Sequence, residues 1–150
     1  MKKNNKGFTL AELLIVVAII AVLVAISIPI FNSQLEKSRE ATDVANIRDA
    51  YAEIAVAMID GGLTNDGDAI SVVGTHTATL ASSGMKVTVA NMAVAQKVSG
   101  WTIATPEVAG VKLPTTTPSG ASTNINFEFA ETTNASTGAR QTYLSAITFG

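Results

Sequence analysis

The chain has 150 residues and a mass of 15.5 kDa, which leaves room for one domain and a short additional segment. Ten basic and twelve acidic residues give a net charge of −2, so there is no electrostatic reason to expect general nucleic-acid binding. The absence of cysteine excludes disulfides, thiolate metal sites, cysteine nucleophiles and a lipid-modified cysteine.

The N-terminal segment combines a basic start with an apolar run of membrane length. Lys2, Lys3 and Lys6 precede the run, and basic residues hold the adjoining end of a span in the cytoplasm. Residues 13–26 contain no polar side chain. The 24 residues from Phe8 to Phe31, at about 1.5 Å of helix per residue, are enough to cross a bilayer. We predict a single membrane span over residues 8–31.

Glu12 is the one charged residue inside this span. An ionised carboxylate at such a depth costs roughly 2.5 kcal/mol or more, so we expect Glu12 to have a partner or a task. It lies one helical turn after Phe8. The simpler interpretation is that Glu12 extends its carboxylate towards the interface of a plain membrane anchor.

A secretory signal peptide is the first interpretation of such a start. No small-x-small cleavage site closes the apolar run, which continues through Pro29 into a long helical pattern. The sequence Lys6-Gly7-Phe8-Thr9-Leu10-Ala11-Glu12 resembles instead the type III signal of type IV pilins and the related pseudopilins. The proline near the end of the span, Pro29, fits the same family. The resemblance covers about the first thirty residues.

The resemblance implies a processing step and an assembly role. In this family a prepilin peptidase cleaves after the glycine and methylates the new N-terminal amine, here after Gly7 and on Phe8. The carboxylate of Glu12 is then expected to meet the N-terminal amine of a neighbouring subunit, and Pro29 to lie in the assembling helix. The implied partners are identical subunits in a helical filament, the peptidase, a cytoplasmic assembly ATPase and a membrane platform protein.

Beyond the span the helical pattern becomes amphipathic. Apolar residues recur at alternating spacings of three and four, which predicts one buried stripe made of Val44, Ile47, Tyr51, Ile54 and Met58. Polar residues are expected on the other faces, and these are Arg39, Glu40, Asp43, Arg48, Asp49 and Glu53. Arg39 and Asp43 have the i,i+4 spacing of an ion pair. Asp60-Gly61-Gly62 is expected to end the helix.

The remaining residues offer strands to cover this stripe. Ile70–Val73 is a short apolar run, and Met85–Val98 is read as a short helix that ends at Ser99-Gly100. Predicted strands are Trp101–Ile103, Val111–Leu113, Ile125–Phe129 and Tyr143–Phe149, with a hairpin loop over Thr132–Arg140. We predict an α+β fold in which a long N-terminal helix packs on a small antiparallel sheet, like that of a type IV pilin.

Other candidate sites are weaker. Asp60, Asn65, Asp66 and Asp68 offer oxygen ligands of the kind calcium prefers, but they also form an ordinary turn cluster. His76, the one histidine, is expected in a surface loop, as is the polar stretch Pro114–Thr123. Asn134-Ala135-Ser136 matches the N-glycosylation pattern. No nucleotide-binding loop, catalytic constellation or cofactor site is predicted.

The sequence therefore predicts a structural subunit of a type IV pilus rather than an enzyme. Its parts are a cleaved leader over residues 1–7, a membrane and filament-core helix over 8–31, and a head over 32–150. Before assembly the subunit is expected to be a single-pass membrane protein among lipids, and after assembly it is expected to be part of an extracellular filament. The alternatives are a pseudopilin of a type II secretion or DNA-uptake system, and a solitary membrane-anchored binding protein. The missing cysteines favour a Gram-positive source.

Overall fold

The computed structural model describes residues 7–81, 85–120 and 122–150. By its internal contacts the chain divides into two units, residues 1–35 and residues 36–150. The described part of the first unit is called the anchor below, and the second unit is called the head. The predicted boundary between the membrane helix and the head lay at residue 32, four positions earlier.

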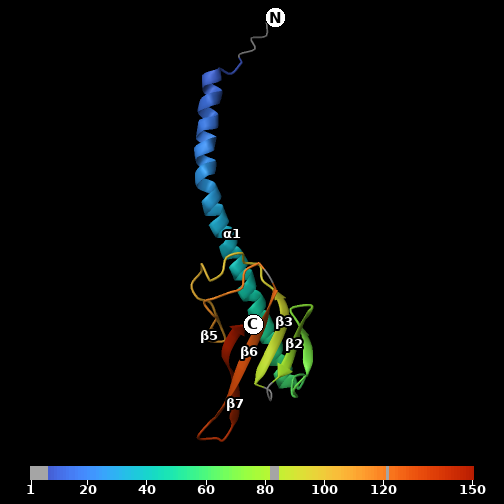
Figure 1. Ribbon diagram of the computed structural model, residues 1–150. Coiled ribbons are helices and arrows are strands. Elements are labelled where there is room, and N and C mark those ends of the chain that lie inside the picture. Colours follow the sequence, from blue (N-terminus) through green and yellow to red (C-terminus); the bar gives the residue numbers. More distant parts are fainter. Residues whose placement is uncertain (1–6, 82–84, 121) are drawn as a thin grey trace, which may run out of the picture. The chain divides into compact units, whose positions relative to one another are not determined.

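A single helix, α1, runs over Leu10–Asp60 and supplies both the anchor and the first element of the head (Figure 1). No glycine interrupts it. It ends where Gly61 takes a positive φ of 81°, so that the N–H groups of Gly62 and Leu63 both reach the carbonyl of Ala57. This is the glycine-dependent helix end that the sequence predicted.

The head contains a five-stranded antiparallel sheet in the order β1-β2-β3-β6-β7. Its strands are β1 (Ala69–Val72), β2 (His76–Ala81), β3 (Lys86–Ala93), β6 (Ser122–Thr133) and β7 (Arg140–Phe149). The short strands β4 (Glu107–Val108) and β5 (Val111–Lys112) form a separate hairpin. The predicted α+β class and the antiparallel sheet are confirmed.

The core of the head lies between the apolar stripe of α1 and one face of this sheet. Val44, Ile47 and Ile54 of the stripe are buried, and Tyr51 and Met58 pack against them. Alternate residues of the strands face them, among them Val87, Val89, Ile125 and Phe127. Tyr51 lies with its ring centroid 6.2 Å from that of Phe127 and 6.5 Å from that of Phe129. The stripe predicted from the sequence is therefore confirmed.

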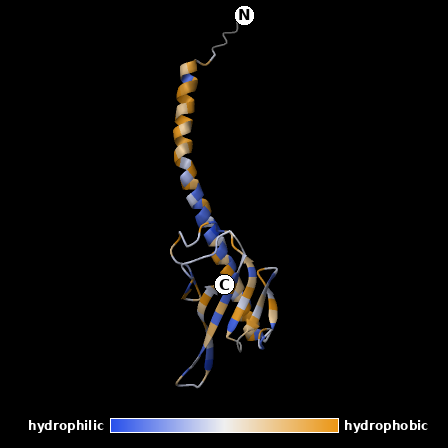
Figure 2. Cartoon of the chain, viewed as in Figure 1, coloured by the Kyte–Doolittle hydropathy of each residue, from blue (hydrophilic) through white to orange (hydrophobic). Residues whose placement is uncertain are grey.

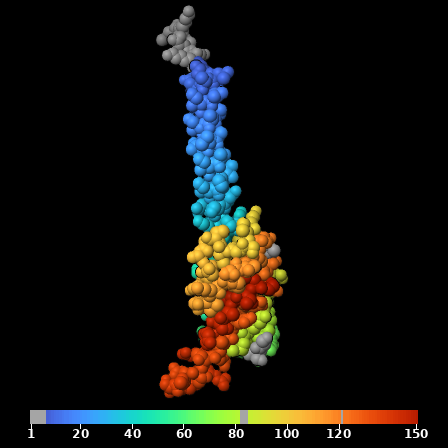
Figure 3. Space-filling view, turned by 60° about the vertical axis from the view of Figure 1, so that its left-hand side comes forward, coloured from blue at the N-terminus to red at the C-terminus, as the bar shows by residue number. Residues whose placement is uncertain are grey.

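Three of the four predicted strands are present, two of them with longer bounds. Ile125–Phe129 is the centre of β6, and Tyr143–Phe149 lies in β7. Their pairing continues to Thr133 opposite Arg140, so the predicted hairpin loop shortens to the residues between them. The distal part of this β6–β7 hairpin stands clear of the rest of the head (Figure 3). Val111–Leu113 contributes only the two-residue strand β5.

One predicted helix and one predicted strand are wrong. Residues 86–93 form β3 rather than a helix, because Val87 and Val89 face the core while the strand pairs with both β2 and β6. Trp101–Ile103 is an irregular segment rather than a strand. Its N–H groups at Thr102 and Ile103 are bound by a carboxylate of α1 instead of a neighbouring strand.

Candidate functional site

The first turn of α1 is closed by a reciprocal pair of residues, Thr9 and Glu12. The hydroxyl and the backbone N–H of Thr9 donate to Glu12 Oε2, at 2.7 Å and 2.8 Å. The N–H of Glu12 in turn donates to Thr9 Oγ1, at 3.3 Å. This arrangement is a capping box, which satisfies N–H groups that the first turn of a helix leaves without partners. In the single chain the carboxylate of Glu12 therefore has a local task.

The predicted cleavage site precedes this turn. Gly7 and Phe8 lie outside regular structure, and the Phe8 side chain is 83% exposed. Among the described residues, no atom beyond the chain neighbours of Gly7 lies within 4 Å of the position that its Cβ would occupy. An exposed peptide bond outside regular structure is what a protease needs for access. The lysines of the predicted leader lie outside the described residues.

Most of the anchor's length is coloured as hydrophobic in Figure 2. From Leu13 to Phe31 its large apolar side chains remain roughly half or more exposed in the single chain. By length and composition α1 is long and apolar enough to cross a membrane. A helix that is apolar all round needs a partner other than water, which is lipid or further helices.

Pro29 lies inside α1, where its ring nitrogen has no hydrogen to donate to the carbonyl one turn earlier. Two residues before Pro29, the hydroxyl of Ser27 donates to the carbonyl of Leu23 at 2.6 Å. Side-chain bonds of this kind compete with the helical ladder and bend helices. The backbone of α1 therefore lacks one N–H donor near the end of the predicted membrane span.

Comparison with known proteins decides what this N-terminal arrangement is. Residues 2–28 match the family model of the prokaryotic N-terminal methylation motif. The chain therefore carries this N-terminal methylation motif. The predicted processing signal thus coincides with a recognised one, and Gly7, Phe8 and Glu12 all lie inside the matched range.

Curated relatives that match the chain include fimbrial proteins. The chain is 41% identical over 71 residues to a type IV major fimbrial protein FimA of Dichelobacter nodosus strain VCS1703A, which covers 47% of this chain and 44% of the relative. It is 44% identical over 61 residues to a fimbrial protein of Dichelobacter nodosus, which covers 41% of this chain and 38% of the relative. The matches thus span less than half the length of these relatives. No solved structure matches the chain.

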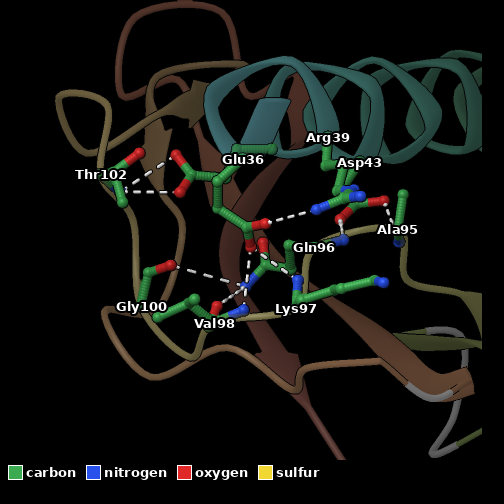
Figure 4. Close-up of polar contacts among 10 residues, drawn as sticks. Glu36, Arg39, Asp43, Ala95, Gln96, Lys97, Val98, Gly100 and Thr102 are labelled. Carbon is green, nitrogen blue, oxygen red and sulfur yellow. Dashed lines mark hydrogen bonds and ion pairs between the residues drawn. The ribbon is translucent and has the colours of Figure 1, made fainter. Parts of the chain in front are cut away.

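The head contains a second polar arrangement, which the sequence did not reveal. Glu36, Glu40 and Asp43 lie on one face of α1 and are 6%, 0% and 6% exposed. The segment facing them, residues 95–103, is called the strap below. Figure 4 shows backbone N–H groups of the strap pointing at carboxylates of the helix. The prediction that Glu40 and Asp43 lie on outer polar faces is wrong.

Each of the three carboxylates binds a pair of neighbouring N–H groups from the strap. Asp43 accepts hydrogen bonds from residues 95 and 96 at 2.8 Å and 3.0 Å, and Glu36 accepts them from residues 97 and 98 at 2.6 Å and 2.8 Å. Glu40 accepts them from residues 102 and 103, at 2.9–3.0 Å. Buried N–H groups need acceptors, and here carboxylates replace a neighbouring strand.

Arg39 forms an ion pair with one of these carboxylates, and the pKa values of Glu36 and Asp43 are shifted in opposite directions. Arg39 pairs with Glu36 at 3.1 Å rather than with Asp43, as its spacing had suggested. Burial tends to raise the pKa of Glu36, but the N–H donors of Val98 and Lys97 and the Arg39 guanidinium outweigh it and lower that pKa. Burial raises the pKa of Asp43 despite its two N–H donors, and the charges of Glu36 and Glu40 add to the effect.

The calcium candidates build a turn. Asp68 Oδ2 accepts the N–H groups of Thr64 at 2.8 Å and Asn65 at 2.7 Å, and these bonds hold the pKa of Asp68 below its ordinary value. Asp60 is the last residue of α1, and Asp66 lies within the turn. Over the described ranges no group of three or more histidines or carboxylates is arranged to hold a metal ion.

Two further sequence candidates have defined places. His76 is the first residue of β2 and pairs with Val72 of β1, so its prediction as a loop residue is wrong. It is half-buried. Asn134 lies in the loop of the β6–β7 hairpin, and its Oδ1 accepts hydrogen bonds from the N–H and hydroxyl groups of Ser136 at 2.9 Å and 2.6 Å. The Asn134 side chain thus forms a local turn.

Proposed function

We propose that this chain is the structural subunit of a type IV pilus, processed between Gly7 and Phe8 and assembled through its N-terminal helix. The proposal rests on the contrast between the anchor portion and the head portion of α1. The anchor portion of α1 exposes an apolar surface on every side, while the head portion buries a single stripe against its own sheet. An exposed apolar surface of this size has to be covered.

The proposal gives the anchor two coverings in succession. Lipid covers it while the subunit is a single-pass membrane protein, and the anchors of other copies cover it in the filament. The methylation motif over residues 2–28 supports the first step, because it marks a segment that is cut on the cytoplasmic side of the membrane. The fimbrial names of the relatives support the second.

Glu12 sets the register of the assembled anchors in this proposal. Cleavage before Phe8 creates a positively charged amine one helical turn from Glu12. Within an apolar bundle that amine needs a counter-charge, and a carboxylate from a neighbouring copy supplies it at a fixed axial offset. Glu12 is held at the start of α1 by Thr9, so its position along the helix is defined before assembly.

Filament assembly needs an energy source, which we assign to other proteins rather than to this chain. We infer that a prepilin peptidase, an assembly ATPase and a membrane platform protein act on the subunit, and that it functions as a building block rather than as an enzyme. A pseudopilin of a secretion or DNA-uptake system would share the same N-terminal chemistry. Long fibres on intact cells, seen by immunogold microscopy, distinguish a pilus from such a short filament.

The experiment that tests the proposal is N-terminal mass spectrometry of filament material sheared from cells that express the native chain. We expect a mature protein that begins at N-methylated Phe8. Gly7→Leu should leave the leader attached and the protein in the membrane, since a bulky residue replaces the glycine at the cut. Ala135→Leu, in the exposed loop of the β6–β7 hairpin and far from the motif in sequence, is the control. Filaments whose subunits still begin at Met1 would overturn the proposal.

A further inference from the structure

The strap connects the first turns of the head portion of α1 to the inside of the sheet. It follows shortly after β3, which ends at Ala93. The Ser99 hydroxyl donates to the carbonyl of Thr117 at 2.7 Å, and the Trp101 Nε1 donates to the carbonyl of Pro114 at 2.8 Å. Both acceptors belong to the loop before β6. Because β3 and β6 are paired neighbours away from the sheet edges, a displacement of the strap is resisted by two inner strands.

On the helix side the strap is held at three points that follow one another along α1. Glu36, Glu40 and Asp43 span about 10 Å of the helix axis, at about 1.5 Å per residue. Together they accept hydrogen bonds from six N–H groups of the strap. Hydrogen bonds to an ionised acceptor are roughly twice as strong as neutral ones, and they weaken steeply when their geometry is distorted. These contacts therefore oppose even a small axial displacement of α1.

The same three residues are the first part of the head on which a pull along α1 acts. Such a pull enters the head at residue 36, where the chain passes from the anchor unit to the head unit. Among the described residues of α1, Glu36 is the first that is buried, and the apolar stripe starts only at Val44. Tension on the helix is therefore borne by the strap contacts before it reaches the apolar core.

Equilibrium stability alone is a weak reason for three buried carboxylates. Taking charges out of water costs free energy, and apolar residues of similar volume are often at least as stabilising. The next turns of the same buried face carry Ile47, Ala50 and Ile54. Burial of apolar surface is non-directional, whereas the carboxylates add bonds whose direction is fixed across the interface between helix and strap.

We propose that the strap is a mechanical latch, which keeps α1 from sliding out of the head when a filament is pulled. The inference rests on the proposed function, because a filament with packed anchors transmits tension to each head through α1. Forced unfolding depends on the rate of unfolding rather than on the equilibrium free energy. Three attachment points on one strap share the load, so they raise the barrier to the first displacement of the helix.

The test is single-molecule force spectroscopy of the full chain in lipid nanodiscs, pulled in two directions. The native chain contains no cysteine, so pairs of introduced cysteines carry the handles. Lys37→Cys with Ala135→Cys applies the load through α1. Thr75→Cys with Ala135→Cys applies it along the paired strands β2, β3 and β6. All three positions are exposed.

Glu40→Gln keeps the shape of a fully buried side chain and removes its charge. We expect the unfolding rate at constant force to rise about tenfold when the load passes through α1, since bonds to a charged group are lost. The rate should change little when the load passes along the strands. Ile147→Val, which removes one methylene from the core of the head, is the control and should change both rates alike.

If Glu40→Gln does not fold, Glu36→Gln takes its place, since it removes a different attachment point of the same strap. An equal acceleration in both directions would overturn the latch, because the carboxylates would then act only through overall stability. Unchanged unfolding through α1 would overturn it as well. Either result leaves the pilus proposal intact, because cleavage and filament yield are measured separately.

Discussion

At the residue scale, Thr9 and Glu12 explain why a carboxylate is tolerable at the start of an apolar helix. The carboxylate of Glu12 accepts both the N–H and the hydroxyl of Thr9, so its charge is partly offset by donors of its own turn. The sequence contained this signal, because Thr-x-x-Glu before an apolar run is the pattern of a capping box. The pilin resemblance implies a partner for Glu12 in the neighbouring subunit and says nothing about Thr9.

Thr9→Val tests the capping role. The substitution removes the hydroxyl that donates to Glu12 and accepts its N–H, and we expect the first turn of α1 to lose about 1 kcal/mol, the typical value for an N-cap. Hydrogen exchange at the amides of Glu12 and Leu13, measured in detergent, should accelerate roughly fivefold. Thr9→Ser keeps the hydroxyl and should exchange like the native chain. Equal exchange in all three proteins would show that the capping box does not hold the turn.

At the element scale, the buried face of α1 begins before its apolar stripe. Residues 36, 40, 43, 47, 50 and 54 are all buried and recur at spacings of four and three. The first three are carboxylates and the last three are apolar. A search for apolar periodicity therefore found the second half of this face and assigned the first half to solvent. The regular spacing of the acidic residues was the signal that could have revealed them.

A strand could be predicted where polar and apolar residues alternate and one of its faces packs on the core. Strict alternation in β6 placed Ile125, Phe127 and Phe129 on the core side, as found. The β1–β2 hairpin was missed because its loop contains Val73-Gly74, both with positive φ, where Asn-Gly is the usual signal. β3 was misread because its last residues are good helix formers, and pairing with two strands overrode that local preference.

The opposite pKa shifts of Asp43 and Glu36 predict how the stability of the head depends on pH. A carboxyl with a raised pKa binds its proton more readily in the folded state, so Asp43 adds stability as the pH falls through its folded pKa, which lies above 3.8. Glu36, whose folded pKa lies below 4.5, contributes stability above that pH and loses it as the pH falls further.

Denaturant unfolding of the full chain in detergent, measured between pH 7 and pH 3, checks both signs. In Asp43→Asn, the free energy of unfolding should rise less than in the native chain as the pH falls from 7 through the folded pKa of Asp43. In Glu36→Gln, the free energy of unfolding should fall less than in the native chain as the pH drops below 4.5. Glu131→Gln, an exposed carboxylate of the β6–β7 hairpin, should change neither slope. A native chain that becomes steadily less stable from pH 7 downward, with no contribution from Asp43, would contradict the assignment.

At the scale of the whole molecule, the two units need different surroundings. The head covers the stripe of α1 with its own sheet, so we expect a fragment of residues 33–150 to fold as a soluble monomer. Ile54 is fully buried in that core, and Ile54→Asp should unfold the fragment, because a carboxylate without a partner replaces an apolar side chain.

Two-dimensional NMR spectra of the fragment and its variant check this prediction. Val56→Asp, at an exposed position two residues along the same helix, is the control and should keep the dispersed spectrum of the parent. A dispersed spectrum for Ile54→Asp that matches the parent would mean that the stripe is not the core of the head.

The central claim is that Glu12 pairs with a neighbouring amine in the assembled filament, and two variants of this residue test it directly. Glu12→Gln keeps an oxygen that can accept from Thr9 and removes the charge, whereas Glu12→Val removes both. Breaking a buried ion pair costs roughly 3–5 kcal/mol, and a filament repeats that loss at every subunit. Both variants should still enter the membrane and be cleaved, since the anchor becomes less charged.

The measurement is the amount of processed protein in the sheared-filament fraction relative to the membrane fraction, for the native chain and both variants. We predict that both variants are processed, accumulate in the membrane and yield few or no filaments. Normal filament yield from processed Glu12→Gln protein would show that Glu12 acts through its bonds to Thr9 rather than through its charge, and normal yield from Glu12→Val would contradict any assembly role for this carboxylate.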